Sequence, residues 1–405
     1  MGLVMRTRSS LPALLALALG YFTFGTSSLA LVGLSPSIGA DLGVPPARVG
    51  LLVSVFALTF AIGAPLLPVL LGRLNRKHTL LVGLAVMSAG GVLSAMATSY
   101  PALTAARVLT ALGAAAYAPQ ASAAGSLIVP EHRRPRALAT VFGGMTAAAV
   151  LGVPLATFLG NLQGWRWALT VIAGLTVLAL ALVAVALPPV EAGEQPKFSG
   201  YRTVLGTHGA VPTVLTTLLF MASQFTVYGV AAAYITDRFD ATTSQTALVL
   251  LAFGVLGVIG NAVASRTFRT LGGARTITLT LTGLGVAFLA LTVAPAWLGA
   301  AVVLFSFWAF FSQLYQAPQQ TRLVELLPDH RAILLALNAS TMYVGVSLGS
   351  FLGGTLLPTV GAQALTAVAL LPLACAVAAH VVSVRQTGKA RTADVPATAI
   401  ARSTR

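Results

Sequence analysis

Residues 101–140 read PALTAARVLTALGAAAYAPQASAAGSLIVPEHRRPRALAT, and residues 295–341 read PAWLGAAVVLFSFWAFFSQLYQAPQQTRLVELLPDHRAILLALNAST. Both stretches begin with Pro-Ala, continue as an apolar run that carries Pro-Gln near its end, and then reach Pro, an acid, His and Arg before the next apolar run begins. A run of about 20 apolar residues can cross a bilayer as a helix. One membrane unit that recurs about 200 residues later predicts a chain built from two related halves.

The composition excludes an ordinary soluble domain. Hydrophobic residues make up 57% of the 405 residues and charged residues only 8%, whereas soluble domains carry roughly 25% charged residues. The net charge is +15, which in a soluble protein would suggest nucleic acid. Here the basic residues lie in short gaps between apolar runs, so membrane topology explains the charge and no nucleic-acid partner is expected.

The apolar runs predict twelve spanning helices, since each is about 20 residues long and none alternates apolar with polar residues as a barrel strand does. The expected spans lie near 11–34, 49–71, 79–98, 101–126, 137–159 and 165–187, then 210–234, 245–264, 275–293, 296–320, 332–357 and 361–383. The fold class is therefore an all-α membrane protein of two pseudo-repeated six-helix bundles.

The stretches between the spans set the expected domain boundaries. Residues 1–10 form an N-terminal arm, 11–187 and 210–383 the two bundles, 188–209 a polar central linker, and 384–405 a short polar tail expected to be disordered. Residues 35–42 contain residues that disfavour helix and are expected to form a loop. The first apolar run exceeds the core of a cleaved signal peptide, so it is interpreted as a spanning helix.

The positions of Lys and Arg predict the orientation. With the N-terminus inside, 20 of the 24 basic residues fall in inner segments, three (Arg48, Arg166 and Arg238) in outer segments, and Arg107 within a span. Because short cytoplasmic loops are enriched in Lys and Arg, both termini are expected in the cytoplasm.

Three local patterns accompany the repeat. The turn after the second span runs from Gly72 to Lys77, with Asn75 and Arg76 in a basic cluster. Arg107 lies inside the fourth span. In the fifth span, Gly143 and Gly144 are followed by Gly152, Val153 and Pro154.

With these patterns, residues 11–385 resemble the major facilitator superfamily, and specifically its twelve-span drug/proton antiporter group, which includes sugar- and chloramphenicol-efflux relatives. The resemblance implies the major facilitator fold, and it implies gating or conformational roles for Gly72, Asn75, Arg76, Gly143, Gly144, Gly152 and Pro154. Asn75 stands where the family pattern has Asp, so a charge-pair latch at this turn is in doubt.

Arg107 is a charged residue within an expected spanning helix. A charge at the centre of a spanning helix costs about 2.5–3.5 kcal/mol on insertion scales, so such a residue usually faces the bundle interior or a wet cavity. It would then bind an anionic solute group or gate proton movement. The alternative is an arginine that extends to the nearby interface. The glycines and Pro154 likewise fit either rocking of the halves or plain close packing.

Polar and aromatic residues inside the spans are the candidate substrate cavity, because such groups need partners away from lipid and can bind an organic solute. Some of them are expected to serve only interhelical hydrogen bonding. With Arg107, the candidates are Tyr21, Phe24, Ser28, Tyr117, Gln120, Gln224, Tyr228, Trp308, Gln313, Tyr315, Gln316, Asn338 and Tyr343. One arginine and no acid would suit neutral or anionic solutes rather than organic cations.

No acid falls in the middle of a span, and the five histidines are placed in or near loops and the last helix end. Proton coupling usually needs a buried group that titrates as access alternates. Asp237, at the outer end of the seventh span, is the nearest substitute. Proton antiport is therefore implied by the resemblance and not by the residues, and an uncoupled facilitator stays open.

The function expected is export of a small organic solute, of drug-like, sugar or nucleoside class, across a bacterial cytoplasmic membrane. No phosphate-binding loop, metal motif or nucleophile with a base is present in the sequence, so we expect no enzyme activity and no cofactor. One chain can form the pathway, so a monomer in the bilayer is expected. The rival is a membrane sensor or scaffold derived from a transporter.

Overall fold

The computed structural model describes residues 10–71, 75–190, 203–204, 206–327 and 330–393. The described residues are helical apart from short connections and contain no strand. The N-terminal bundle comprises α1 (Leu11–Leu42), α2 (Pro46–Leu70), α3 (Arg76–Met96), α4 (Tyr100–Leu127), η1 (Glu131–Arg133), α5 (Arg134–Ala147), η2 (Ala148–Gly152), α6 (Val153–Gln163) and α7 (Trp165–Ala186). The C-terminal bundle comprises α9 (Ala210–Tyr228), α10 (Ala231–Phe239), α11 (Thr243–Leu271), α12 (Gly273–Val293), α13 (Leu298–Gln313), α14 (Gln316–Leu326) and α15 (Arg331–Ala393).

Twelve crossings are confirmed among the described residues. Ten helical segments are long and apolar enough to cross a membrane. The last of these, Ile333–Thr387, holds two crossings, because Gly361 has a φ of 79° and breaks α15 into two helices. The alanine-rich α4, which contains Arg107, supplies the twelfth. The broken fifth, seventh and tenth crossings consist of α5–η2–α6, α9–α10 and α13–α14.

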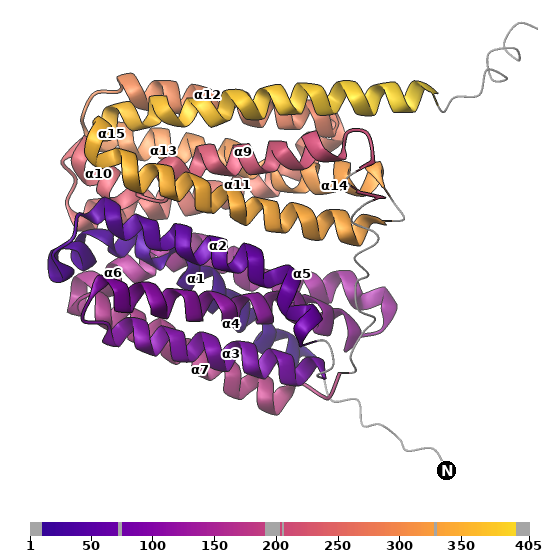
Figure 1. Cartoon of the computed structure of the whole chain (residues 1–405), viewed down its shortest axis with the longest axis horizontal. Helices are drawn as coiled ribbons and strands as arrows, with labels where there is room; N and C mark the ends of the chain where they lie inside the picture. The colour runs from indigo at the N-terminus through magenta and orange to yellow at the C-terminus, as the bar shows by residue number, and fades with distance from the viewer. Residues whose placement is uncertain (1–9, 72–74, 191–202, 205, 328–329, 394–405) are drawn as a thin grey trace, which may run out of the picture.

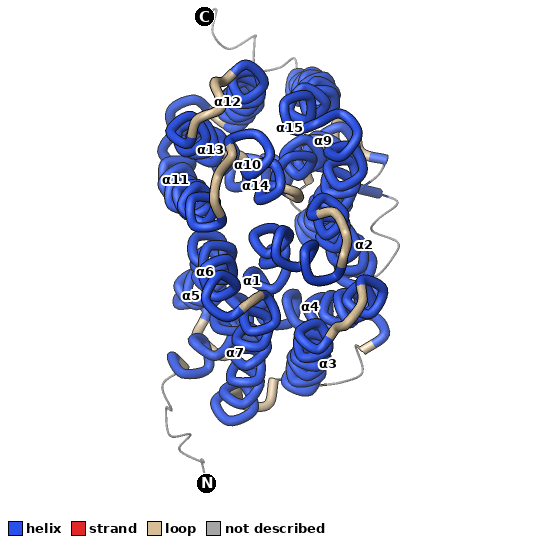
Figure 2. The backbone as a smooth tube through the Cα atoms, turned by 90° about the vertical axis from the view of Figure 1, so that its left-hand side faces the viewer, coloured by secondary structure: helices blue, strands red, loops and turns tan. Residues whose placement is uncertain are grey.

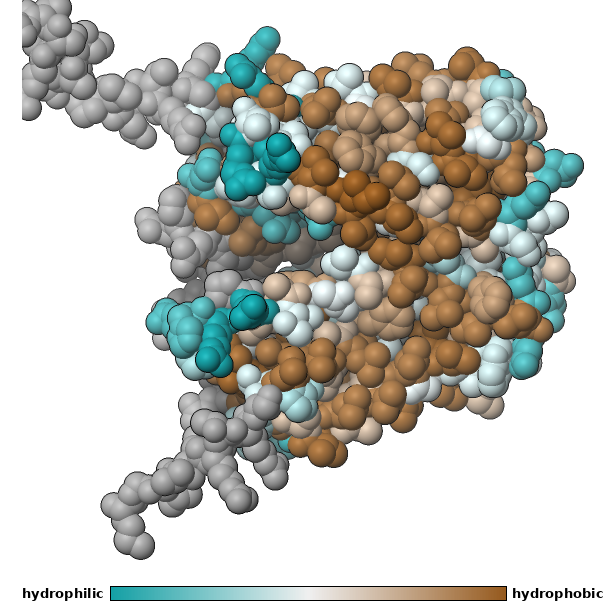
Figure 3. All heavy atoms as spheres, turned by 180° about the vertical axis from the view of Figure 1, so that it is seen from behind, coloured by the Kyte–Doolittle hydropathy of each residue, from teal (hydrophilic) through white to brown (hydrophobic). Residues whose placement is uncertain are grey.

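The two bundles lie side by side (Figures 1 and 2), and both described chain ends lie at the same end of the molecule (Figure 1). We call that end, where α1 begins and α2 connects to α3, the terminal end, and the other the opposite end. Apolar side chains cover the outside between the two ends (Figure 3). Such a belt is what lipid requires of a helical bundle.

A glycine stripe fixes the packing inside the C-terminal bundle. Gly345, Gly349 and Gly353 of α15 face the backbone carbonyls of Leu218, Ala222 and Thr226 of α9. Both sets repeat every four residues, so one face of each helix meets the other without side chains in between. A methyl group at any of the three glycines would overlap a carbonyl oxygen.

Two expectations for helix ends are wrong. Residues 35–42, expected as a loop, continue α1 to Leu42, where the left-handed Gly43 ends it. Pro36 lies inside this helix, so its ring did not end the helix as the breaker argument supposed. At the other end of the chain, α15 continues to Ala393 rather than ending near residue 383. Residues 394–405 of the expected tail lie outside the described residues, as does most of the linker.

The fifth crossing contains a π-helical turn, η2, which ends two residues before Pro154. Proline has no N–H to donate to the preceding turn, and π-turns commonly absorb such a defect. Gly152, in this turn, lies against Thr26 of α1. On α11, Gly254 faces the backbone of Val150 in the same turn. The π-turn therefore touches both bundles at once.

Candidate functional site

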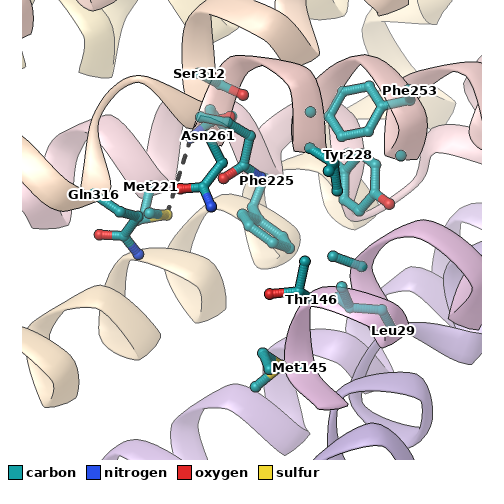
Figure 4. Close-up of a pocket in the computed structure, with 16 residues that line it drawn as sticks. Leu29, Met145, Thr146, Met221, Phe225, Tyr228, Phe253, Asn261, Ser312 and Gln316 are labelled. Carbon is teal, nitrogen blue, oxygen red and sulfur yellow. Dashed lines mark hydrogen bonds between the residues drawn. The ribbon is translucent and has the colours of Figure 1, made fainter. Parts of the chain in front are cut away.

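A cavity of about 330 Å³ lies between the two bundles (Figure 4). Most of its wall comes from the C-terminal bundle, through α9, α11, α13 and α14, while α1, α5 and η2 close the other side. The lining residues are Leu29, Met145, Thr146, Ala149, Met221, Gln224, Phe225, Tyr228, Phe253, Gly254, Gly257, Val258, Asn261, Ser312, Gln313 and Gln316.

The wall of the cavity is mostly apolar, and the polar groups in it are uncharged. Four carboxamides, from Gln224, Asn261, Gln313 and Gln316, line it together with hydroxyls of Ser312 and Thr146, and none of the sixteen lining residues carries a charge. Carboxamides offer both donors and acceptors. The cavity can therefore hydrogen-bond a neutral solute without a buried ionic partner.

One amide has its orientation set by a tryptophan. The indole Nε1 of Trp308 donates to Oε1 of Gln224 over 3.2 Å. Indole N–H can only donate, so the oxygen of Gln224 must face Trp308. The amide nitrogen is left with a weak 4.0 Å contact to the sulfur of Met221 (Figure 4). Gln224 thus holds a donor available to the cavity.

A second amide leaves an acceptor free. Nε2 of Gln316 contacts the sulfur of Met342 at 3.1 Å, whereas its Oε1 is buried and has no partner among the described residues. Buried polar atoms without partners are uncommon and point to a missing ligand or water. The two amides together match a solute with its own acceptor and donor.

Aromatic rings form the wall behind the amides. Tyr228 stacks on Phe253 with ring centroids 4.8 Å apart, and Trp308 meets both rings edge-on. Phe225 packs edge-on against Tyr228. Rigid rings of this kind give an organic solute a large apolar surface at a small entropic cost.

The structure brings four of the expected cavity residues together: Gln224, Tyr228, Gln313 and Gln316. Trp308 lies one layer behind, bonded to Gln224. Tyr315 and Asn338 lie elsewhere in the C-terminal bundle. Both bond the hydroxyl of Thr217, at 3.0 and 2.6 Å, within a buried polar network.

The expected candidates of the N-terminal bundle do not line the cavity. The hydroxyl of Tyr21 donates to the carbonyl of Ala118, that of Tyr117 to Leu17, and that of Ser28 to Gly25. Phe24 stacks on Phe60 at 5.0 Å, and Tyr343 reaches across from α15 to the same ring at 4.2 Å. These aromatics fill the contact between helices.

Arg107 is buried, with an exposed fraction of 1%, and also does not line the cavity. Its guanidinium donates to the carbonyls of Ser27 and Ser28 on α1, over 2.8 and 3.2 Å, and lies 4.5 Å from the ring centroid of Phe56. Its Nε has no partner among the described residues. In this conformation Arg107 joins α4 to α1 and α2.

The expected gating residues divide into several groups. Gly72 lies outside the described residues. Asn75 caps α3 by accepting from the backbone of Lys77 at 2.9 Å, and Arg76 donates to Gln120 over 3.1 Å, which ties α3 to α4.

The fifth-span glycines differ from one another. Gly144 faces the carbonyl of Ala18 on α1 so closely that a methyl group would overlap it, whereas nothing lies within 4 Å of the corresponding position at Gly143. Gly144, Gly152 and the π-turn before Pro154 therefore set the packing of this span, and Gly143 does not.

Sequence reasoning missed Asn261, Thr146 and Ser312. Asn261 follows Gly254, Gly257 and Gly260, which mark one face of α11 as a close-packed surface. A polar residue next to such a face was the signal that could have found it.

The described acids lie at helix ends, as expected: Asp41, Glu131, Asp237, Asp240 and Glu325. The placement of the histidines was wrong in one case. His380 is 3% exposed, inside α15, and contacts Arg322.

Direct contacts between the bundles run from the middle of the molecule toward the opposite end. The hydroxyl of Ser54 on α2 donates to the carbonyl of Ser347 on α15 at 2.7 Å. Further along, Gly354 lies against Ala47, and Gly50 against Gly229. At the terminal end the surface is hollowed between the bundles (Figure 3). The bundles therefore meet at the opposite end and part at the terminal end.

Comparison with known proteins agrees with this architecture. The sequence profile of the Major Facilitator Superfamily matches residues 17–211 and 213–404. The inner membrane transport protein YdhP of Escherichia coli (strain K12) is 32% identical over 354 residues, covering 85% of this chain and 88% of that protein. The chloramphenicol resistance protein of Streptomyces lividans is 32% identical over 62% of this chain and 65% of its own length.

Two further similarities bear on function and fold. The transcription regulatory protein OpdE of Pseudomonas aeruginosa is 28% identical over 86% of this chain and 88% of its own length. Among solved structures, a bacterial homolog of the human lysosomal transporter Spinster superposes with a TM-score of 0.77, at 16% identity over 92% of this chain and 96% of that chain. The expected fold class is thereby confirmed, and the chain belongs to the major facilitator superfamily of membrane transporters.

Proposed function

We propose that this transporter exports a small uncharged organic solute across a bacterial cytoplasmic membrane by alternating access. The observation that carries the proposal is the cavity between the bundles, lined by carboxamides and aromatic rings without a charged side chain. Contacts that run from Ser54 and Ser347 in the middle to Gly354 and Ala47 close the opposite half, while the terminal end is hollowed. An interface with one closed and one open end is what a rocking mechanism requires.

The charge distribution supports cytoplasmic termini, because the basic residues concentrate in the segments on the side of the N-terminus. With that orientation, the terminal end faces the cytoplasm and the conformation described above is inward-open. The cavity then receives a solute from the cytoplasm, as export requires.

The chemistry of the wall supports an uncharged solute. Arg107, the charged group once expected in the cavity, donates its hydrogen bonds to α1 instead. The donor on Gln224 and the acceptor on Gln316 favour a solute with carbonyl, amide or hydroxyl groups. Amphenicols, sugars and nucleosides all fit this description, and a chloramphenicol resistance protein is among the relatives.

The energy source is either a proton gradient, as in the antiporter group that the sequence resembles, or the gradient of the solute itself. The described acids lie at helix ends rather than between the bundles. The alternative mechanism is therefore an uncoupled facilitator.

A second candidate function is sensing. One relative, OpdE, is named as a transcription regulatory protein. A sensor would bind a solute in the same cavity without moving it, so flux rather than binding separates the two functions.

The test is solute flux in proteoliposomes, with chloramphenicol, arabinose and uridine as neutral probes and tetraphenylphosphonium as a cationic probe. We expect flux of at least one neutral probe and none of the cation. Gln224→Ala should raise the apparent KM about fivefold, because a hydrogen bond to the solute is worth about 1 kcal/mol. Gln320→Ala is the matched control, since Gln320 is exposed on α14 and outside the cavity.

Flux of the cation alone would contradict the proposed solute class. Binding of a neutral probe without flux would favour the sensor. Flux that is indifferent to an imposed pH gradient would identify the facilitator.

A further inference from the structure

His380 is the histidine that the structure buries deeply. Its exposed fraction is 3%, whereas His78, His132 and His208 are exposed and His330 is half-buried. It lies on the second helix of α15 and contacts α12 and α14. A titratable group enclosed between three helices of a membrane bundle is costly to keep and needs an explanation.

The contacts of His380 define one protonation state. Nε2 lies 3.1 Å from the carbonyl oxygen of Ala274 and 3.1 Å from the hydroxyl of Thr278. A carbonyl can only accept, so Nε2 carries the proton. Nδ1 lies 3.4 Å from Nη1 of Arg322, which can only donate. The arrangement therefore fits the neutral imidazole with its lone pair on Nδ1.

Arg322 holds the other side of this cluster. Its Nη2 donates to the hydroxyl of Ser383 over 2.9 Å, and that hydroxyl is 2.6 Å from the hydroxyl of Thr213 on α9. The side-chain carbons of Arg322 fill the space beside Gly273, at the start of α12. Arg322 on α14 thus contacts α12 and two side chains of α15, and Ser383 connects this cluster to α9.

The other charged and titratable groups around the cluster act on Arg322. Glu325 lies on α14, and Tyr315 directly precedes that helix. Both interact electrostatically with the guanidinium of Arg322. From α12, the groups bonded to His380 are the uncharged Ala274 carbonyl and Thr278. From α15 itself, the near polar group is Ser383. The charge that faces the imidazole directly is therefore that of Arg322.

A proton on Nδ1 would reverse this contact. Two donors would face each other, and two positive charges would lie 3.4 Å apart in a medium that screens them poorly. Arg322 would have to leave, and its bond to Ser383 and its packing beside Gly273 would be lost with it.

The displaced helix reaches the cavity. α14 is only 11 residues long, and Arg322 is near its end at the terminal side. At its start lies Gln316, which lines the cavity, and between them Gln319 donates to the carbonyl of Thr213 and the hydroxyl of Thr217 over 2.7 and 3.1 Å. A shift of Arg322 is therefore transmitted to the solute site through one short helix.

We propose that His380 is a proton-binding site, and that its protonation expels Arg322 and releases α14 from α12 and α15. By linkage, the conformation with α14 released binds the proton more tightly, so acid favours that conformation. The inference uses the proposed function only in assuming that the bundle rearranges during transport. Its test needs no solute and no flux, so either proposal can fail alone.

The test measures the position of α14 against pH in the full chain, reconstituted in nanodiscs. Spin labels are placed on Glu131→Cys, at the exposed η1, and on Gln320→Cys, at the exposed side of α14, in a Cys375→Ser background. Double electron–electron resonance then gives the distance distribution from about pH 8 to about pH 4, a range that spans the ordinary histidine pKa of about 6.5. We expect a reversible shift of the distribution on acidification.

Three variants locate the proton. His380→Gln keeps one donor and one acceptor but cannot be protonated, so the shift should disappear. Arg322→Gln removes the repelled charge, so the shift should disappear there too. His78→Gln changes an exposed histidine on α3 and should leave the shift intact.

A wild-type distribution that does not move, or a His380→Gln variant that still shifts with pH, would overturn the proposal. If His380→Gln fails to fold, Arg322→Gln decides, because an acid-induced shift that survives in that variant would equally overturn it.

Discussion

Arg107 is a buried cation whose partners are backbone carbonyls of Ser27 and Ser28 rather than an acid. Its planar guanidinium reaches two successive carbonyls at once, and its face lies over Phe56. A lysine could not reproduce this geometry, because its ammonium is a compact point charge without the planar fork of a guanidinium. We therefore assign Arg107 to the joint between α4 and α1.

Arg107→Ala should destabilise the protein by about 2 kcal/mol or more, since hydrogen bonds to a charged group contribute roughly 1.5–3 kcal/mol. The measurement is thermal unfolding in detergent, followed by flux. Maximal flux should fall while the apparent KM for a transported probe stays within about twofold, and Arg107→Lys should be intermediate in stability. A large rise in KM with unchanged stability would instead mean that Arg107 binds the solute.

Gln120 and Gln224 show how far residue types predict a site. Both are amides within an apolar run, and both were expected to line the cavity. In the structure Gln120 accepts from Arg76, whereas Gln224 accepts from Trp308 and faces the cavity. An apolar run shows that a polar group must find a partner, but the partner depends on which helices pack beside it.

At the scale of the element, α5 carries two adjacent glycines with different surroundings. Gly144 faces the backbone of Ala18 on α1, and Gly143 faces open space. The pair permits a comparison in which the helix and the chemistry of the substitution are the same and only the surroundings differ.

Gly144→Ala should destabilise the protein by about 1–3 kcal/mol, because the added methyl group overlaps a carbonyl that can move only with its helix. Gly143→Ala should be neutral or stabilising by up to about 1 kcal/mol, since alanine favours helix over glycine. Thermal unfolding of both variants in the same detergent is the measurement. Equal effects at the two positions would refute the packing of α5 on α1 described above.

Helix ends were harder to predict than helices. Ser35, Pro36 and Gly39 suggested a loop, yet α1 continues to Leu42 and is ended by Gly43 in the left-handed conformation. The polar residues of this segment satisfy themselves locally, as when Ser35 donates to Val32 and Ser37 to Leu34. Breakers therefore lower helix propensity without ending a helix that the surrounding bundle supports.

At the scale of the whole molecule, the repeat and the twelve crossings could be predicted because lipid forces each long apolar run into a helix. The conformation of the bundles could not be predicted from the sequence. Which end is closed depends on a few contacts between bundles, such as Ser54 with Ser347 and Gly354 with Ala47, and those residues look ordinary in the sequence. The buried pair of His380 and Arg322 was missed for the same reason.

The central claim is that the bundles rock about the cavity, so the contacts that run from the middle to the opposite end must open during transport. The most direct test is flux after cross-linking Ser54→Cys to Ser347→Cys, whose native hydroxyls are 2.9 Å apart, in a Cys375→Ser background. Oxidation should abolish flux of the neutral probe and reduction should restore it, while each single-cysteine variant transports under both conditions. Undiminished flux through a fully cross-linked protein would contradict alternating access at this interface.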